Sequence, residues 1–293
     1  MSENAIEIRG LEKAFTKFKL GPLDLTVPRG AIYGFIGRNG AGKTTTMDLM
    51  FGMGDADAGT ITVNGLDHRR DEVAFKQRVG YVNPDTSFMV WGTVGRAIRF
   101  VRGFYPHWDH AYCDELMAAF DLDAKDAIVT LSFGAKTKLG LLLALAHRPE
   151  VLILDEPTTG LDAISRKLVF EELLKSVQEG DRTVLISSHG LADLERFADH
   201  VGFIKEGGLL LEGRTDEVVE RYRQVDLEAP NGLPVNGADG CHVIRQDGDR
   251  WRVLIDQSRG VGERISASGA RELANAPVTL EEMFVGLMGE DEK

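Results

Sequence analysis

A glycine-rich segment, GRNGAGKT at residues 37–44, carries the sharpest chemical signal in the sequence. It fits the pattern GxxxxGK[ST], and it lies between a predicted strand and a predicted helix. This position favours a phosphate-binding loop, because an ordinary glycine-rich turn would not require it. In such a loop the backbone N–H groups surround the phosphates of a nucleotide. Lysine reaches the β and γ oxygens, and the following hydroxyl binds Mg²⁺. The predicted nucleotide-binding residues are Gly37, Arg38, Asn39, Gly40, Ala41, Gly42, Lys43, Thr44 and Thr45.

Two adjacent acids end a second apolar run, VLILDE at residues 151–156. Open α/β sheets bind ligands at the carboxyl ends of their strands, so both acids are predicted at the edge where the glycine-rich loop lies. We expect Asp155 to hold Mg²⁺ together with Thr44, and Glu156 to polarise the water that attacks the γ-phosphate. On the residues alone, either acid could instead simply begin the next turn.

Three further candidates each have a simple structural alternative. Ser132 in LSFGA suits a phosphate contact at a helix start, but serine is also a good N-cap. His189 in ISSHG follows a predicted strand, although a loop histidine is usually only solvated. Asp162 in TTGLD could equally cap the helix that begins near Ala163.

The order of these motifs, over about residues 5–220, resembles that of ATP-binding cassette (ABC) ATPases. The resemblance implies ATP and Mg²⁺ as cofactors and two cassettes that meet head to tail, either two copies of this chain or this chain and a paralogous subunit. Ser132 and Gly134 of one cassette would close over the nucleotide held by the other. It also implies that His189 contacts the γ-phosphate and links it to Glu156, and that Asp162 joins the two protomers.

Two aromatic residues compete for one further role that the resemblance implies, stacking on adenine. Phe15 occupies the family's position for that aromatic, a core phenylalanine is the alternative reading, and Phe18 could serve instead. The segments FYPHWD at 104–109 and LGPLDLTVPRGAIYGFIG at 20–37 are similar to the ATPase subunits of bacterial Ytr-type exporters. This closer resemblance implies a separate membrane subunit as partner and a peripheral position on the cytoplasmic face of the bacterial inner membrane.

The sequence departs from the family pattern at two places. Phe133 and Ala135 stand where the signature motif has a glycine and a glutamine. The segment VGYVNPD at 79–85 occupies the position of the family's glutamine loop but contains no glutamine, and Asp85 is its nearest polar substitute. In the family, this glutamine normally senses the membrane partner and the attacking water. Its absence therefore bears more on the coupling of hydrolysis to transport than on ATP binding.

Apolar runs at 31–37, 151–155 and 183–187 show no polar alternation, which is typical of central parallel strands covered on both faces. A helix is predicted from about Ala163 to Glu179, and a hairpin should turn at Gly207 and Gly208. The fold class is therefore α/β, and the resemblance makes it a P-loop ABC cassette with a mostly parallel central sheet and an antiparallel β subdomain.

Two domains are predicted: an ATPase domain over 1–225, with a helical lobe at about 86–135, and an α+β accessory domain over 226–293. A linker rich in Gly, Pro and Asn at 228–240 precedes two short strands near 242–244 and 251–255. Thr279 and Glu282 form a capping-box pair for the last helix.

Aromatic residues gather within the predicted lobe. Their best interpretation is a surface that docks on a membrane subunit, and a small local core is the alternative. A metal site at His107, His110, Cys113 and Asp114 is a weaker reading. The aromatic residues are Phe88, Trp91, Phe100, Phe104, Tyr105, Trp108 and Tyr112.

Composition limits the function classes. The chain has 293 residues and a net charge of −12, the wrong sign for a protein that mainly binds nucleic acid. Its two cysteines lie far apart in sequence, so no disulfide framework is expected and a reducing compartment fits best. Apolar runs are shorter than a membrane span, and the first residues lack the pattern of a signal peptide, so we expect a chain that is neither membrane-spanning nor secreted.

Other function classes explain less of the sequence. A soluble ABC-type regulatory ATPase without a membrane partner would usually carry two cassettes or a long coiled-coil insertion, and this chain has neither. A GTPase or small-molecule kinase would leave LSFGA and His189 unexplained, and the guanine motif NKxD is absent. A binding module that does not hydrolyse ATP remains an alternative because the glutamine is missing.

Overall fold

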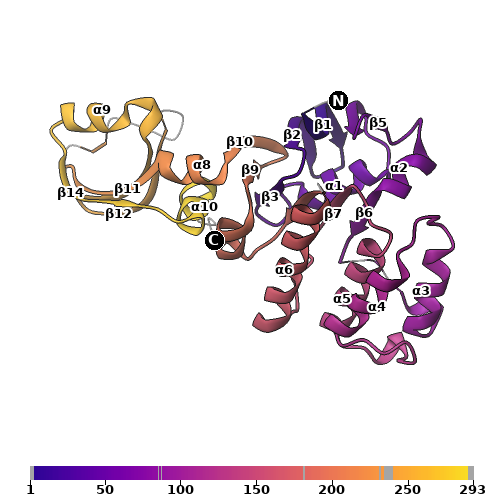
Figure 1. The fold of residues 1–293 in the computed structure, drawn as a ribbon. Coiled ribbons are helices and arrows are strands. Elements are labelled where there is room, and N and C mark those ends of the chain that lie inside the picture. The colour runs from indigo at the N-terminus through magenta and orange to yellow at the C-terminus, as the bar shows by residue number, and fades with distance from the viewer. Residues whose placement is uncertain are drawn as a thin grey trace. The chain divides into compact units, whose positions relative to one another are not determined.

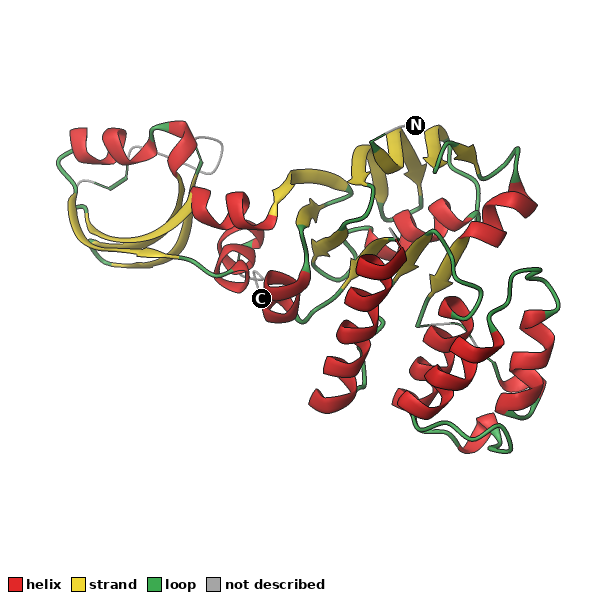
Figure 2. Cartoon of the chain, viewed as in Figure 1, coloured by secondary structure: helices red, strands yellow, loops and turns green. Residues whose placement is uncertain are grey.

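The computed structural model describes residues 3–84, 86, 88–180, 182–230, 232–233 and 240–289. The chain divides into two compact units (Figures 1 and 2). The first unit comprises Met1–His189 and Gly202–Leu211, and the second comprises Gly190–Val201 and Glu212–Lys293. The predicted domain boundary at 225/226 lies inside a strand of the second unit, and the assignment of separate roles to two domains stays a prediction.

A six-stranded sheet forms the centre of the first unit, in the order β10-β9-β3-β8-β7-β6. β3 pairs with β8, β8 with β7 and β7 with β6, all in parallel, and every residue of β3, β7 and β8 is buried. This confirms the central parallel strands predicted from the uninterrupted apolar runs. The strands are β3 (Ile32–Gly37), β6 (Val79–Val82), β7 (Val151–Leu154), β8 (Thr183–Ser187), β9 (His200–Lys205) and β10 (Gly208–Arg214).

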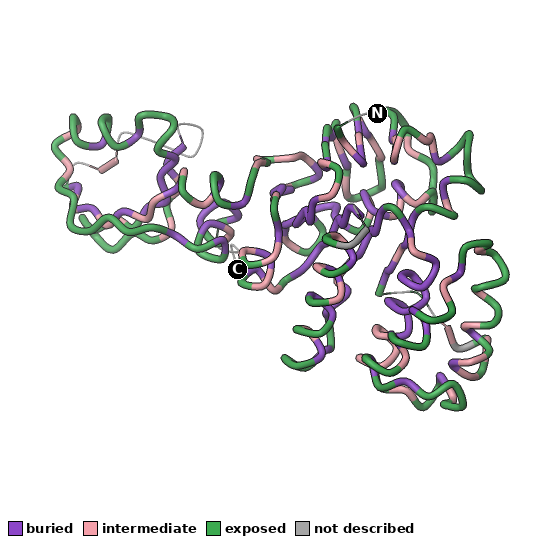
Figure 3. Tube along the Cα trace, viewed as in Figure 1, coloured by how far each residue is buried: buried purple, intermediate pink, exposed green. Residues whose placement is uncertain are grey.

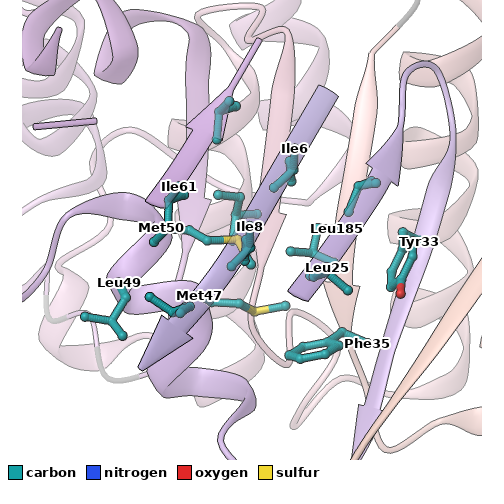
Figure 4. Close-up of a cluster of buried hydrophobic side chains, with 14 of the residues drawn as sticks. Ile6, Ile8, Leu25, Tyr33, Phe35, Met47, Leu49, Met50, Ile61 and Leu185 are labelled. Atoms are coloured by element: carbon teal, nitrogen blue, oxygen red, sulfur yellow. The ribbon is translucent and has the colours of Figure 1, made fainter. Parts of the chain in front are cut away.

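A second, four-stranded sheet in the order β2-β1-β4-β5 is antiparallel throughout. Its buried side chains, among them Ile8 and Leu25, join those of α1 and of the six-stranded sheet in one hydrophobic cluster (Figure 4). Met47 and Met50 of α1 lie in this cluster, so the helix that follows the glycine-rich loop is packed in the core. The elements are β1 (Asn4–Ala14), β2 (Lys19–Pro28), α1 (Lys43–Phe51), β4 (Ala58–Val63), β5 (Leu66–Asp67) and α2 (Glu72–Arg78).

The helices α3, α4 and α5 are in contact, with α5 packed against both α3 and α4 (Figure 1). The predicted lobe at about 86–135 contains α3 and α4 but only the first residues of α5. Trp108, Tyr112 and Cys113 are buried, so this part of the aromatic cluster is a local core. Burial raises the pKa of the Cys113 thiol to about 11. The residues that the structure describes include no group of three or more His, Cys, Asp or Glu side chains able to hold a metal ion. The elements are η1 (Met89–Trp91), α3 (Val94–Arg102), α4 (His110–Ala119), η2 (Ile128–Thr130), α5 (Phe133–Leu145) and α6 (Ala163–Gly180).

The second unit contains an antiparallel sheet in the order β12-β13-β11-β14 and its own hydrophobic cluster, to which α9 contributes Val261 and Ile265. Figure 3 shows the backbone coloured by how far each residue is buried. Both strands predicted near 242–244 and 251–255 form, and both extend further. The capping box of Thr279 and Glu282 is present at the start of α10. The elements are α7 (Leu191–Phe197), α8 (Thr215–Arg221), β11 (Tyr222–Glu228), β12 (Cys241–Asp247), β13 (Arg250–Asp256), η4 (Gln257–Arg259), α9 (Val261–Ala267), β14 (Arg271–Pro277) and α10 (Leu280–Met288).

A helix that crosses a membrane must be both long and apolar. In the part of the chain that the structure describes, no helix combines the length and the apolar character needed to cross a bilayer.

The β9–β10 hairpin turns at the predicted glycines and supports the glycine-rich loop. Gly207 N donates to Ala41 O at 3.0 Å, and Gly21 N donates to Gly207 O at 2.8 Å. Gly207 has φ +83°, and a Cβ at this position would lie 2.2 Å from Lys19 O. Only glycine therefore fits at this point, because both the left-handed backbone and the close approach exclude a side chain.

Gly207→Ala should lower the free energy of unfolding by more than the roughly 1 kcal/mol that a left-handed alanine costs, since a backbone clash adds to it. The measurement is the shift of the urea unfolding midpoint. Gly208→Ala is the control, because its Cβ would meet only Lys205 O, at an ordinary 3.8 Å. Equal midpoints for the two variants would contradict this account of the turn.

Candidate nucleotide site

The glycine-rich loop ends where α1 begins, at Lys43. Gly40 and Gly42 take φ values of +79° and +111°, which let the loop turn with its amides exposed above the helix start. Lys43 is buried, and its Nζ donates to Gly37 O at 2.7 Å and to Arg38 O at 3.3 Å. Burial lowers the pKa of the Lys43 ammonium, and the carboxylates of Glu156 and Asp155 oppose that shift. A phosphate bound here would meet a cation, the backbone of the glycine-rich loop and the positive end of α1.

A cavity of about 450 Å³ opens beside this loop. It brings together predicted residues from three elements that are distant in sequence: the loop, the end of β7 and the end of β8. Gly37 and Ala41 are buried and do not line it. The lining residues are Phe18, Arg38, Asn39, Gly40, Gly42, Lys43, Thr44, Thr45, Asp155, Glu156 and His189.

Asp155 joins the three elements at the base of the cavity. Its side chain is 1% exposed, and it accepts hydrogen bonds from Thr44 Oγ1 at 2.6 Å and from Ser187 Oγ at 2.5 Å. A carboxylate and a hydroxyl are oxygen donors of the kind that Mg²⁺ takes beside phosphate oxygens and waters, so these residues fit that ion. The sequence analysis did not identify Ser187, although a serine at the carboxyl end of a buried strand beside β7 was the available signal.

Glu156 and His189 face each other at the cavity. His189 Nε2 lies 3.2 Å from Glu156 Oε1, and His189 N donates to Glu156 Oε2 at 3.3 Å. The backbone of Glu156 has φ +47°, a left-handed conformation that a non-glycine residue adopts at a cost of roughly 1–3 kcal/mol. Its amide is held by Ser187 Oγ at 3.0 Å. The carboxylate is thus fixed by strained backbone and by contacts from β8 and the loop after it.

Of the two aromatic candidates for adenine stacking, Phe18 lines the cavity and Phe15 does not. Phe15 is half exposed and stacks on Phe18, with 6.3 Å between the ring centroids. The assignment of either ring to adenine stays a prediction.

Ser132, Gly134 and Asp162 do not line the cavity. Ser132 caps α5 by accepting from Ala135 N at 3.1 Å, and Asp162 caps α6 by accepting from Ser165 N at 2.9 Å. Hydrogen bonds from the amide and hydroxyl of Ser165 lower the pKa of the Asp162 carboxyl. Both structural alternatives are therefore present, and both side chains remain exposed for a further role.

The substituted signature residue Phe133 packs against the loop that contains Asp162. A Cβ built on Gly160 would lie 2.3 Å from Phe133 Cδ1, and one built on Gly134 would lie 3.1 Å from Gly160 O. Gly160 also has φ +74°. The start of α5 and the TTGLD loop therefore form one continuous surface within the chain.

The segment 79–85 lacks the family's glutamine, and Asp85, its predicted substitute, lies outside the described residues. Asn83, which the sequence analysis did not single out, is buried and donates to Asp48 Oδ1 and to Tyr81 Oη, both at 3.0 Å. Tyr81 Oη donates to Asp48 at 2.5 Å, and burial together with this bond raises the pKa of Tyr81. The network ties the end of β6 to α1 beside the site.

Comparison with known proteins places the chain in a family. The family model described as ABC transporter matches residues 20–159. ABC transporter ATP-binding protein YtrB of Bacillus subtilis (strain 168) is 33% identical over 291 residues, which cover 97% of this chain and 98% of that protein. The chain belongs to the ABC transporter family. It is an ABC ATPase, as the motif order predicted.

Other matches agree with this assignment. Daunorubicin resistance ATP-binding protein DrrA3 of Streptomyces coeruleorubidus is 32% identical over 320 residues, covering 100% of this chain and 98% of that protein. A solved structure of an ATP binding subunit of an ABC transporter superposes with a TM-score of 0.68 at 25% identity, covering 73% of this chain and 91% of the other. The likeness confirms the predicted α/β P-loop cassette.

Lys43→Ala should raise the Kd for Mg-ATP about ten- to a hundredfold, because a buried cation that bonds phosphate oxygens is lost. Calorimetric titration measures this, with Lys167→Ala on the exposed face of α6 as the control. Unchanged affinity in Lys43→Ala would remove the assignment of this loop to phosphates.

Proposed function

We propose that this ABC ATPase powers an exporter, binding ATP between two cassettes and coupling their closure to a separate membrane subunit. The observation that carries the proposal is the contact of Glu156 and His189 in the same cavity as Lys43, 3.2 Å apart at their closest atoms. A carboxylate beside a phosphate-binding loop is placed to act on a water molecule, and a phosphate store alone would not need it.

The hydrolytic step uses this chain's own groups. Lys43 and the loop amides hold the β and γ phosphates. Glu156 accepts the proton of the attacking water as the water oxygen bonds to the γ-phosphorus, and the bond from that phosphorus to the β–γ bridging oxygen breaks, so that ADP leaves and phosphate is formed. His189 fixes the Glu156 carboxylate and faces the γ-phosphate. Bound Mg²⁺, with Thr44 and Asp155 as its protein ligands, would withdraw negative charge from the phosphate oxygens.

A second cassette accounts for the exposed part of the predicted site. Ser132 and Gly134 lie at the N-terminal end of α5, whose free amides and positive end suit an anion brought by another chain. Asp162 lies on the adjoining loop. We infer that these residues cover the nucleotide of a second copy, or of a paralogous subunit, and that closure requires tighter binding of ATP than of its products.

A membrane subunit is the proposed partner of the lobe. Four rings follow one another there: Phe88 to Trp91 at 5.7 Å, Trp91 to Phe100 at 5.3 Å and Phe100 to Phe104 at 5.2 Å between centroids. Phe100 and Phe104 are 50% and 62% exposed, which leaves an aromatic surface of the kind found at protein interfaces. A relative named Nod factor export ATP-binding protein I, from Burkholderia lata, is 33% identical over 98% of this chain and supports export. Such a role would put the protein on the cytoplasmic face of the bacterial inner membrane.

Glu156→Gln should lower the rate of phosphate release at least about a hundredfold, because an amide cannot accept the proton of the attacking water. ATP binding should persist, so a dimer should accumulate with saturating Mg-ATP, measured by size-exclusion chromatography with light scattering. Glu115→Gln on α4 is the control. Hydrolysis at the wild-type rate would exclude Glu156 as the base, and a Glu156→Gln chain that stays monomeric would exclude a site shared between two copies of this chain.

Phe100→Ser with Phe104→Ser should weaken association with the membrane subunit while ATP affinity is retained, since both rings lie on the lobe surface. Co-purification with membrane-spanning proteins encoded beside this gene measures the effect. Val73→Ser, at an even more exposed apolar position on α2, is the control. Equal recovery from both variants would exclude the aromatic surface as the docking site.

A further inference from the structure

The helix that follows His189 belongs to a different unit from His189 itself. The first unit has two segments, and the longer one ends at His189. Residues Gly190–Val201 belong to the second unit, and the second segment of the first unit begins at Gly202. This short excursion contains α7, which begins at Leu191. One residue, Gly190, therefore separates the histidine that contacts Glu156 from a helix that is part of the C-terminal unit.

Glu195 fastens α7 to α10. Its Oε2 accepts a hydrogen bond from the amide of Leu280 at 2.7 Å. Leu280 is the first residue of α10, and the first backbone N–H groups of a helix have no partner inside it. Leu194 on α7 is completely buried, as are Leu280 and Met283 on α10, and the two helices are in contact. A carboxylate at a helix N-terminus is stabilised by the helix dipole as well as by the hydrogen bond.

A second attachment holds the C-terminal end of α7. Thr215 Oγ1 donates to Ala198 O at 2.6 Å, and Thr215 N donates to Asp199 O at 3.0 Å. Thr215 is buried and begins α8, which leads directly into β11 of the sheet. The excursion is thus bonded to the rest of the C-terminal unit at Glu195 and at Ala198 and Asp199, by bonds that α7 itself does not need for its helical structure.

We propose that Glu195 is a positioning residue for His189: by locking α7 to α10, it lets the C-terminal unit set where His189 stands relative to Glu156. Both the imidazole and the backbone amide of His189 contact the Glu156 carboxylate, at 3.2 and 3.3 Å. Because Gly190 alone lies between His189 and the start of α7, a displacement of that start would change both contacts. The inference rests on the proposed roles of Glu156 and His189 in hydrolysis.

Glu195→Ala removes the acceptor for Leu280 N, and it should lower kcat for ATP hydrolysis about two- to thirtyfold, the range expected for loss of a helix-capping contact. KM for ATP should be unchanged, because Glu195 lies outside the nucleotide cavity. Glu195→Gln keeps a carbonyl oxygen that accepts the bond, so it should restore most of the rate. Glu263→Gln on the exposed face of α9 is the matched control.

Two further readouts separate positioning from general loss of structure. In a His189→Ala background, Glu195→Ala should cause no additional fall in single-turnover rate, because its effect passes through His189. Amide hydrogen exchange over residues 189–194 should rise in Glu195→Ala and stay at the wild-type level in Glu195→Gln. Thr215→Val, which removes the bond to Ala198 O after the C-terminal end of α7, should act in the same direction and serves if Glu195→Ala does not fold.

The outcomes also distinguish this inference from the proposed function. If the wild-type protein does not hydrolyse ATP, the proposed function fails, and the exchange measurement still tests the link between Glu195 and His189. If the wild type hydrolyses ATP and Glu195→Ala matches it in kcat and in exchange, the positioning role is overturned. An equal loss of rate with and without His189 would also overturn it.

Discussion

The first unit is organised around one buried carboxylate. Asp155 is almost fully removed from water, and an unpaired charge in that environment would cost several kcal/mol. Hydroxyls from α1 and from β8 satisfy it, at 2.6 and 2.5 Å. The glycine-rich loop and the ends of β7 and β8 must therefore converge on this point. Every other site residue in the cavity takes its position from that convergence.

Sequence reasoning succeeded where short-range pattern decides structure. The uninterrupted apolar runs identified β3, β7 and β8 as central parallel strands, and glycines marked the turn between β9 and β10. The loop and the paired acids were predicted at one edge of the sheet, His189 was added by the family resemblance, and the structure brings all of them to one cavity. Parallel strands explain this success, because their carboxyl ends share one edge.

The failures involve contacts between residues distant in the chain. Neither Ser187 nor the Asn83–Tyr81–Asp48 network follows from local sequence, since each depends on which strand or helix lies alongside. Local sequence does not distinguish Phe15 from Phe18 either; Phe18 lines the cavity and Phe15 does not, and the stacking of either ring on adenine stays a prediction. The predicted boundary at 225/226 followed a change in composition, but β11 continues through it because Val225 and Leu227 fill the cluster of the second unit.

The packing of Phe133 on Gly160 has a consequence for how such a chain can evolve. The ring occupies the space that a β-carbon at position 160 would need, at a separation of 2.3 Å. Mutations at the two positions are therefore not independent: a β-carbon at position 160 would force the half-exposed Phe133 ring to move. Phe133, which departs from the usual signature pattern, thus limits which residues fit in the neighbouring loop. In turn, Gly160 influences which residues fit at position 133.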